Sequence, residues 1–554
     1  MTQKVTPQTV LGAFDGRELV DLDARYRVRR KGDEYWVEMP DPRWLLERAV
    51  RGPEAMGAEA PVAEARVVMS TGAHNMQMYW VSTGQGRQLV AFPFSWSVEG
   101  QTWVPNEATL LRPREPYVVY GWNEVCIKCH SVGGEPHANS EAPNTAVAEL
   151  GIACEACHGP GAKHVARQSN PLLRYATHLG WAEVDSVVNP GAMTGHAASE
   201  VGGQCHSASL FPDMVSWLGR GASYRAGQAL LEDLRVVRHP LNANQAWIDD
   251  TLEADPDYLS GRFWPDGMIR ISGRDYNGTL ESPCYADEDF GCMSCHQMHA
   301  SDPANQLSPE GADNRACVAC HEEKGRELEA HTRHAAGGVG SECVNCHMPH
   351  TVYGLTKAIR SHQVSSPNVD ESVSFGRPNA CNICHLDRSL SWAAEALERG
   401  WGLRPEVASE ELAEADAGGL AAGLTWLVKG DAGQRALAAW YFGWAPARQT
   451  AGDDWMVPSL IYALADDYAA VRWVVARSLR GFDGYADEGW DIAAPTGHGL
   501  DVESVAALRA RLMSKWSVSG EARPSLLMDG DGFDAQSWRR AHEARDQRVV
   551  DLRE

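Results

Sequence analysis

The spacing of the cysteines constrains this chain more than any other feature. Of its fourteen cysteines, twelve form six units with the spacing Cys-x-x-Cys-His. With 14 cysteines and 20 histidines among 554 residues, chance would produce roughly 0.01 such units. So regular a spacing requires a chemical explanation. The units are Cys126/Cys129/His130, Cys154/Cys157/His158, Cys292/Cys295/His296, Cys317/Cys320/His321, Cys343/Cys346/His347 and Cys381/Cys384/His385.

Each unit contains the groups that covalent attachment of heme c requires. Two thiols at this spacing can add across the two vinyl groups of one heme, and the adjacent histidine then reaches the iron as its proximal ligand. The alternative is zinc, because Cys-x-x-Cys pairs can combine into four-cysteine sites. Zinc does not require a histidine after every second cysteine, and a disulfide framework would not repeat this spacing. The sequence therefore predicts six hemes c.

Two cysteines lie outside the six units. Cys205 lies in the sequence Gly-Gly-Gln-Cys-His, 202–206, which is the same motif with glycine in place of its first cysteine. One thioether bond from Cys205 and ligation by His206 would hold a seventh heme c. The alternatives are a vestigial site or a disulfide between Cys205 and Cys284, which an oxidising compartment allows. We expect the seventh heme, because Cys205 is in register with a heme motif and Cys284 can be a small buried residue.

A low-spin heme also needs a second axial ligand, for which the other histidines are candidates. His164 closely follows the second unit, while His299 and His350 each lie three residues after a proximal histidine. Two imidazoles on one helical turn could serve two adjacent hemes. The predicted distal ligands are His74, His164, His299, His331, His334, His350 and His362. Further candidates are His137, His178, His196 and His239, with Met298 and Met348 as alternatives to histidine.

The pattern of apolar residues divides the chain into three predicted domains. Residues 1–115 alternate apolar and polar side chains, as at Tyr35, Val37 and Met39, which is typical of strands. Residues 116–390 carry every heme motif. Short helices and loops are expected there, because the hemes would supply most of the apolar core.

Residues 391–554 have apolar side chains at helical spacing. The stretch 467–479, with Val471, Val475 and Leu479 on one face, resembles the inner helix of a HEAT repeat, and a plain helical cap is the alternative. We therefore predict a mainly α protein. It would have a β-rich N-terminal segment, a multiheme cytochrome c domain with short helices and loops, and a C-terminal HEAT-like helical array.

Charge and hydropathy bear on partners and location. The net charge of −24 argues against nucleic-acid binding and allows electrostatic steering of a basic redox partner. No stretch is apolar over 18 residues, so no membrane span is predicted, and the sequence after Met1 has no apolar region of a signal peptide. Heme c is attached outside the bacterial cytoplasm. We therefore expect a periplasmic or extracellular protein whose leader was removed or whose Met1 is not the native start.

These residues together resemble bacterial multiheme cytochromes c that join a heme domain to a HEAT or tetratricopeptide-like array. The segment Cys-Glu-Ala-Cys-His-Gly-Pro-Gly-Ala-Lys-His, 154–164, is similar to one in tetraheme cytochromes and in octaheme enzymes of the hydroxylamine oxidoreductase and tetrathionate reductase types. Further matching runs are 282–285, 292–299, 343–354, 360–362 and 379–385.

The resemblance extends over most of the chain, from 6–12 to 545–548. Two departures matter. Gly202 replaces a cysteine that the family usually has, and the leader and heme motif that usually precede 6–12 are missing. We therefore expect that this sequence starts internally.

Three functions fit this pattern. The first is electron transfer through six or seven hemes, mostly with two histidine ligands, in an extracytoplasmic respiratory pathway. The second is an oxidoreductase acting on nitrite, hydroxylamine or a sulfur oxyanion, which needs one heme with an open distal position, for which Cys205/His206 is the candidate. The third is a docking subunit that recruits redox partner proteins through the C-terminal helices. We expect the first, because the sequence has no nucleotide, flavin or molybdenum motif and has enough histidines to cap every heme.

Overall fold

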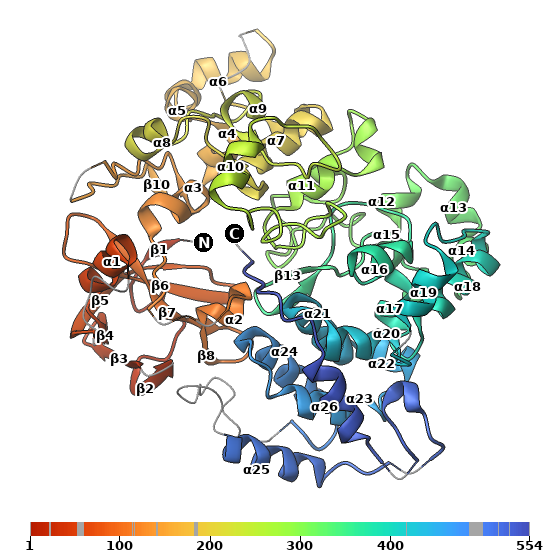
Figure 1. Ribbon diagram of the computed structural model, residues 1–554. Helices are drawn as coiled ribbons and strands as arrows, with labels where there is room; N and C mark the ends of the chain where they lie inside the picture. The colour runs from red at the N-terminus through yellow and green to blue at the C-terminus, as the bar shows by residue number, and fades with distance from the viewer. Residues whose placement is uncertain are drawn as a thin grey trace.

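The computed structural model follows the chain from an N-terminal sheet, through a long region of short helices and loops, to a group of C-terminal helices (Figure 1). The described residues are 2–21, 24–52, 60–113, 115, 117–139, 142–181, 187–416, 418–486, 502–518, 520–530 and 532–552.

The N-terminal region forms an antiparallel sheet in which consecutive strands pair with one another. The strand order is β2-β3-β4-β5-β6-β7-β8, and β1 pairs with β5. The strands are β1 (Gln3–Lys4), β2 (Asp15–Asp21), β3 (Ala24–Lys31), β4 (Glu34–Pro40), β5 (Val62–Thr71), β6 (Met76–Ser82), β7 (Leu89–Ser97) and β8 (Thr102–Pro105). The predicted alternation is confirmed in β4, where Tyr35, Val37 and Met39 are buried.

An aromatic cluster fills the core of this sheet. The rings of Tyr35, Tyr79 and Trp103 surround Phe14 edge-on, at 5.0, 5.2 and 5.4 Å between ring centres. Edge-to-face contacts of this kind add to the stabilisation from burial. Helix α1 (Pro42–Arg51) lies between β4 and β5, and the Asp41 carboxylate caps it by accepting from Arg43 N at 2.8 Å. The sheet therefore has a core of its own.

The middle region carries the heme motifs on short helical turns. Five full motifs lie on or beside α3 (Ile127–His130), α4 (Cys154–His158), α12 (Arg315–Val318), α15 (Cys343–His347) and α17 (Ala380–Cys384), and Cys292 begins the short turn η5 (Cys292–Ser294). The Cys205/His206 motif ends α7 (Gly195–His206). The motifs are connected by further short elements and by loops. The other helices are α2 (Asn106–Leu110), α5 (Ala162–Gln168), α6 (Pro171–His178), α8 (Met214–Arg220), α9 (Leu230–Asp233), α10 (Ile248–Ala254), α11 (Asp275–Leu280), α13 (Glu322–Arg326), α14 (Leu328–Thr332) and α16 (Asp370–Phe375).

Small two-stranded sheets also occur in this region. They pair β9 (Ser131–Val132) with β10 (Glu149–Leu150), β11 (Ser209–Leu210) with β12 (Arg235–Val236), and β13 (Val352–Gly354) with β14 (Lys357–Ile359). The remaining single turns are η2 (Trp122–Cys126), η3 (Pro190–Ala192), η4 (Pro283–Ala286) and η6 (Val339–Ser341).

The C-terminal helices pack into one core with part of the middle region. Helix α21 (Ala432–Gly443) packs against α24 (Ala469–Arg480), and Leu437, Val471 and Leu479 are fully buried between these helices and their neighbours. The other helical elements are α18 (Leu390–Trp401), α19 (Ser409–Ala415), α20 (Ala422–Leu424), η7 (Thr425–Lys429), α22 (Ala445–Ala451), α23 (Met456–Ala463), α25 (Val502–Met513), η8 (Pro524–Leu526) and α26 (Ala535–Glu543).

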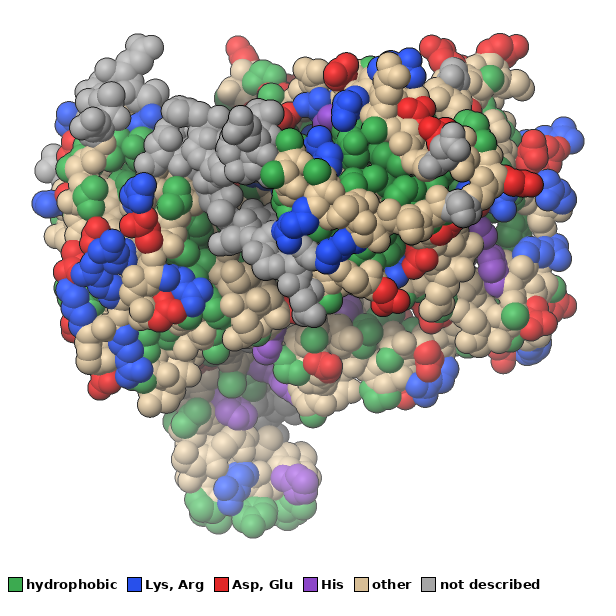
Figure 2. Space-filling view, turned by 90° about the horizontal axis from the view of Figure 1, so that it is seen from below, with side chains coloured by type: hydrophobic (Ala, Val, Ile, Leu, Met, Phe, Trp, Pro, Cys, Tyr) green, Lys and Arg blue, Asp and Glu red, His purple; other side chains and the backbone are tan. Residues whose placement is uncertain are grey.

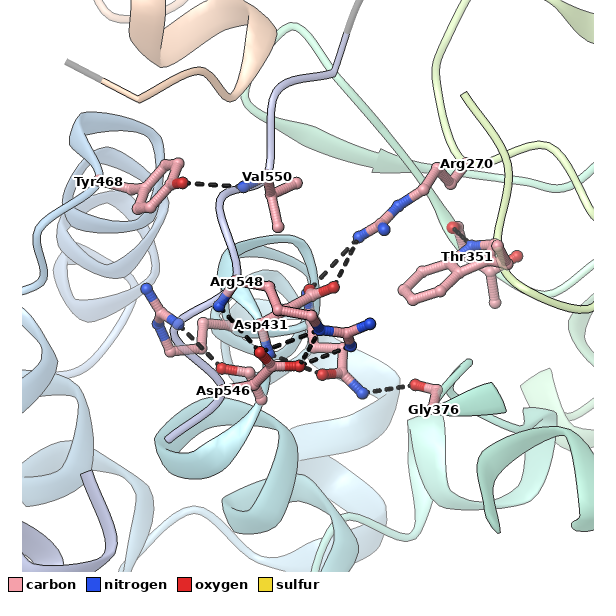
Figure 3. Close-up of polar contacts among 12 residues, drawn as sticks. Arg270, Thr351, Gly376, Asp431, Tyr468, Asp546, Arg548 and Val550 are labelled. Atoms are coloured by element: carbon pink, nitrogen blue, oxygen red, sulfur yellow. Dashed lines mark hydrogen bonds and ion pairs between the residues drawn. The ribbon is translucent and has the colours of Figure 1, made fainter. Parts of the chain in front are cut away.

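A buried ion pair joins the two regions (Figure 3). Arg270, which precedes helix α11, lies 3.2 Å from the carboxylate of Asp431. The same carboxylate caps α21 by accepting from Gln434 N. The side chain of Gln434 in turn donates to the carbonyl of Gly376, ahead of α17. The helical region is therefore fixed to the motif-bearing region by charged and polar contacts as well as by apolar packing.

The prediction of a mainly α protein is wrong. The structure is 41% helical and 15% strand, and the strand content is concentrated in the large N-terminal sheet. Helical periodicity dominates only after residue 390, while the motif-bearing region uses helices of one or two turns joined by loops. Among the described residues, no helix is both long and apolar enough to cross a membrane.

Candidate heme sites

Three motif histidines make the same kind of hydrogen bond through Nδ1. In three full motifs, Nδ1 lies within hydrogen-bond distance of a backbone carbonyl. These are His158 to Val188 O at 2.7 Å, His296 to Asn305 O at 3.0 Å and His347 to Ser365 O at 2.8 Å. A carbonyl can only accept, so Nδ1 must carry the proton and Nε2 presents its lone pair. This is the arrangement in which proteins hold a metal-binding imidazole.

Four motif histidines face a second histidine ring across a constant gap. The pairs are His158–His299 (6.0 Å between ring centres, 19° between planes), His296–His362 (6.3 Å, 25°), His331–His347 (6.1 Å, 2°) and His334–His385 (6.4 Å, 35°). His196 and Tyr285, which do stack directly, are only 3.8 Å apart. Two imidazoles bound to one metal, each by a bond of about 2 Å, have ring centres roughly 6 Å apart. The donor type and spacing therefore fit an iron with two axial histidines.

The segment 331–334 supplies two of these rings. His331 faces His347, and His334 faces His385. The end of helix α18 contacts this segment, where Trp401 Nε1 donates to His331 O at 2.6 Å. The guanidinium of Arg333 also donates to Gly400 O. The beginning of the C-terminal helices thus positions two candidate ligands.

The incomplete motif packs against the first full motif. The Cys129 thiol lies 3.6 Å from Cys205 O, and its contact with the Cys205 thiol lowers the pKa of Cys129 to about 6. The same kind of contact joins the fourth and fifth full motifs, where the Cys317 thiol lowers the pKa of Cys343 to about 7. Cys205 therefore contacts a neighbouring motif through its thiol in the same way as the cysteines of two full motifs contact each other.

Cys284 lies in another part of the structure. Burial raises the pKa of its thiol, and the nearby thiol that contributes is Cys320 of the fourth motif. The neighbours of Cys205 are Cys129, Lys128 and Cys157. The structure therefore does not bring Cys205 and Cys284 together as the disulfide alternative requires.

Asp275 contacts two candidate ligands at once. Its Oδ2 lies 3.2 Å from His206 Nδ1, and its Oδ1 lies 3.0 Å from His362 Nδ1. Burial opposes ionisation of this carboxyl, yet the nearby charge of His362 and the hydrogen bond with His206 hold its pKa well below its ordinary value. No motif in the sequence marks this aspartate, so sequence reasoning missed it.

The other predicted distal ligands have different surroundings. His350 packs between Trp440 and Trp444, with ring centres 4.9 and 5.2 Å away, and burial lowers its pKa to about 3. His74 lies in the exposed turn between β5 and β6, and His164 lies in α5.

The further histidine candidates also occupy other positions. His137 Nδ1 lies 3.0 Å from Asn144 O, and His196 Nε2 lies 2.9 Å from Tyr285 O. His239 lies beside Phe263, and His178 ends α6. Within the described part of the chain, the rings of His130, His206 and His321 are not members of a facing pair.

The zinc alternative lacks geometric support. A four-cysteine zinc site needs its ligands to converge on one point. Within the described ranges, no group of three or more His, Cys, Asp or Glu side chains converges in that way.

Comparison with known proteins agrees with the motif chemistry. Residues 285–326, which include the third and fourth full units, match a family described as a doubled CXXCH motif. A 101-residue region is 24% identical to the multiheme cytochrome MtrA of Shewanella baltica (strain OS185), covering 18% of this chain and 25% of that protein. No solved structure matches the chain. Motif chemistry, ring geometry and both similarities together support a multiheme c-type cytochrome.

Proposed function

We propose that this chain transfers electrons through seven hemes c, six on the full motifs and one on Cys205 and His206. The four facing histidine pairs carry the proposal. An iron with two imidazole ligands has no open position for a substrate, so it serves electron transfer rather than catalysis. The hemes would supply the redox chemistry, while the chain supplies thioether attachment, axial ligands and packing.

Short segments that serve two sites support electron transfer from heme to heme. His296 faces His362 while His299 faces His158, and three residues of chain span at most about 11 Å. The segment from His331 to His334 joins the fifth and sixth full motifs in the same manner. Neighbouring hemes in these two pairs would therefore be close.

Contacts between motif cysteines extend this series of neighbours. Cys129 of the first motif contacts Cys205, and Cys317 of the fourth contacts Cys343 of the fifth. Cys295 of the third motif lies close enough to add to the raised pKa of Cys317, behind the larger effect of Cys343. Together with Asp275, which joins His206 to His362, these contacts connect all seven sites.

A ligand variant tests the assignment. We expect His299→Ala to convert one low-spin heme, the one on His158, into a high-spin heme that binds cyanide, because its sixth ligand is lost. Electron paramagnetic resonance and cyanide difference spectra measure this change. His196→Ala is the matched control, since His196 Nε2 donates to the Tyr285 carbonyl rather than facing a motif histidine. An unchanged spectrum in the His299 variant would contradict the proposal.

Heme content tests the seventh site separately. Pyridine hemochrome absorbance per polypeptide should give seven hemes for the native protein and six for Cys205→Ala. A native value of six, unchanged in the variant, would remove the seventh heme and leave the six-heme carrier.

One observation favours a second candidate function. His130, His206 and His321 face no second imidazole within the described residues, as a heme with an open position would require. The alternative is an oxidoreductase acting on nitrite, hydroxylamine or a sulfur oxyanion. A high-spin ferric signal in the native protein that nitrite or cyanide converts to low spin would establish this alternative over the pure carrier.

We place this function outside the cytoplasm, because heme c is attached there, and we assign partner docking to the C-terminal helices. The HEAT-like repeat within 467–479 remains part of this proposal. Heme staining and N-terminal mass spectrometry of the protein from periplasmic and cytoplasmic fractions test the location. Heme-bearing protein confined to the cytoplasm would contradict it.

A further inference from the structure

We propose that Asp275 is a positioning residue shared by two hemes, and that it sets the reduction potentials of both. The geometry is one carboxylate with an oxygen on each of two imidazoles, at 3.2 Å from His206 Nδ1 and 3.0 Å from His362 Nδ1. His206 belongs to the incomplete motif, and His362 faces His296 of the third full motif. The inference rests on the proposed seventh heme at Cys205 and His206.

Helix α11 is anchored on the His206 side by a second polar residue. The side chain of Asn277 accepts from Ala208 N at 2.7 Å, two residues after His206. The same side chain donates to Val237 O at 2.6 Å. Asn277 is buried, so these bonds fix the beginning of α11 against the chain that follows the incomplete motif.

The other face of α11 is closely docked on the His362 segment. A Cβ atom at Gly278 would lie 2.7 Å from Gln363 N and 2.9 Å from His362 C, so only glycine allows this approach. Ser282 Oγ donates to His362 O at 3.0 Å and accepts from Val364 N at 2.9 Å. Residues 275–282 therefore clamp both ligand segments at fixed positions.

This clamp gives Asp275 its effect on two irons. A carboxylate that accepts from Nδ1–H orients the ring and makes Nε2 a stronger donor to iron, which stabilises the ferric state. Oδ2 forms a hydrogen bond with His206 Nδ1, while Oδ1 lies at ion-pair distance from His362 Nδ1 and acts on that ring through its negative charge, so loss of the carboxylate weakens both donors together. The other facing pairs contain Nδ1 groups bonded to neutral backbone carbonyls, as in His158 and His347.

The test is a redox titration of the intact holoprotein, followed by electron paramagnetic resonance so that individual low-spin hemes are resolved. Asp275→Asn should shift two hemes to more positive potentials, with an increase of about tenfold in the reduced-to-oxidised ratio at a fixed potential, which is about 59 mV for one electron. Asp275→Glu keeps the carboxylate, so its two reduction potentials should lie closer to the native values than those of Asp275→Asn. Asp313→Asn is the matched control, because Asp313 contacts Arg315 beside the fourth motif.

Each outcome decides the proposal. Two shifted hemes in Asp275→Asn, with none shifted in Asp313→Asn, support it. One shifted heme, in a protein whose hemochrome assay gives seven hemes, overturns the sharing while leaving the seventh heme in place. A native assay of six hemes overturns the seventh heme and the sharing with it. Equal shifts in both variants show a general charge effect and overturn the positioning role.

Discussion

The N-terminal sheet and the motif-bearing region obtain their cores in different ways. In the sheet, large side chains such as Phe92 and Trp103 are almost completely buried and pack ring against ring. In the described residues between Tyr276 and Val352, by contrast, Pro349 is buried but no Ala, Val, Ile, Leu, Met, Phe, Tyr or Trp side chain is. The histidine rings there face one another at about 6 Å instead of packing directly. The sheet has an apolar core of its own side chains, whereas the stretch 277–351 of the motif region buries few apolar side chains, as expected where heme c would supply the apolar surface.

The surface carries charged side chains of both signs, together with exposed histidines. Figure 2 shows acidic and basic side chains interspersed over one face, with histidines at the junction between the main body and a protruding lobe. Despite the net charge of −24, the described residues on this face form no large area of a single charge. Histidines at a surface junction fit redox centres that are reached from outside.

The largest effect should come from preventing heme attachment. In protein made without heme attachment, we expect residues 292–347 to lose protection, because their side chains build no core of their own. The strands from 24 to 105 should stay protected by their aromatic core. Hydrogen-exchange mass spectrometry of the apo and holo forms measures both regions. Equal protection of 292–347 in the two forms would show that this stretch does not depend on heme for its core.

The sheet could be predicted from sequence more fully than the motif-bearing region, because its core is formed by its own side chains. Alternation at Tyr35, Val37 and Met39 reports burial within the sheet itself, so the strands could be predicted locally. The fold class could not be predicted, because helical periodicity at the C-terminus gives no information on the loops of 116–390. Helix α1 was also missed, because it interrupts a region, 1–115, whose alternating pattern predicts strands, and its cap at Asp41 is a single side chain.

The second effect in size concerns the sheet core. Trp103→Ala should lower the free energy of unfolding of the sheet by about 4 kcal/mol, the usual cost of removing a buried tryptophan. Chemical denaturation followed by fluorescence measures this loss, and the heme spectrum should stay unchanged. Trp36→Ala is the control, because Trp36 is only partly buried on β4. Loss of heme absorbance in Trp103→Ala would show that the sheet and the motif region are not independent.

The buried contact between the motif region and the helices should come next. Arg270 and Asp431 expose only 7% and 8% of their side chains (Figure 3). Asp431→Asn leaves the guanidinium buried without its countercharge and should cost about 3 kcal/mol. Thermal unfolding followed by circular dichroism measures this. The double variant Arg270→Met/Asp431→Asn should recover part of the loss, and an unchanged melting curve for the single variant would show that the pair is not needed.

The candidate site was predictable to the extent that it depends on local spacing. The Cys-x-x-Cys-His units could be read directly, and His299 and His331 lie close in sequence to motifs that identify them as candidates. His350 has the same offset from His347 as His299 has from His296, yet it packs between Trp440 and Trp444. That packing comes from the end of α21 and the residue that follows it, about ninety residues later, and local sequence contains no signal for it. Asp275 was missed for the same reason, since its role depends on two distant histidines.

The smallest effect is expected on the outer face of the sheet. Lys31 lies 2.6 Å from Glu64, and both side chains are substantially exposed. Glu64 is also paired across the strands with Glu38, a like charge. Glu64→Gln removes the attraction to Lys31 and the repulsion from Glu38 together, so the free energy of unfolding should change by less than about 0.5 kcal/mol. Urea denaturation at low and high salt measures it, and the small difference should shrink with salt because the charges are screened. A loss as large as that of Trp103→Ala would mean that surface charge, rather than the aromatic core, stabilises the sheet.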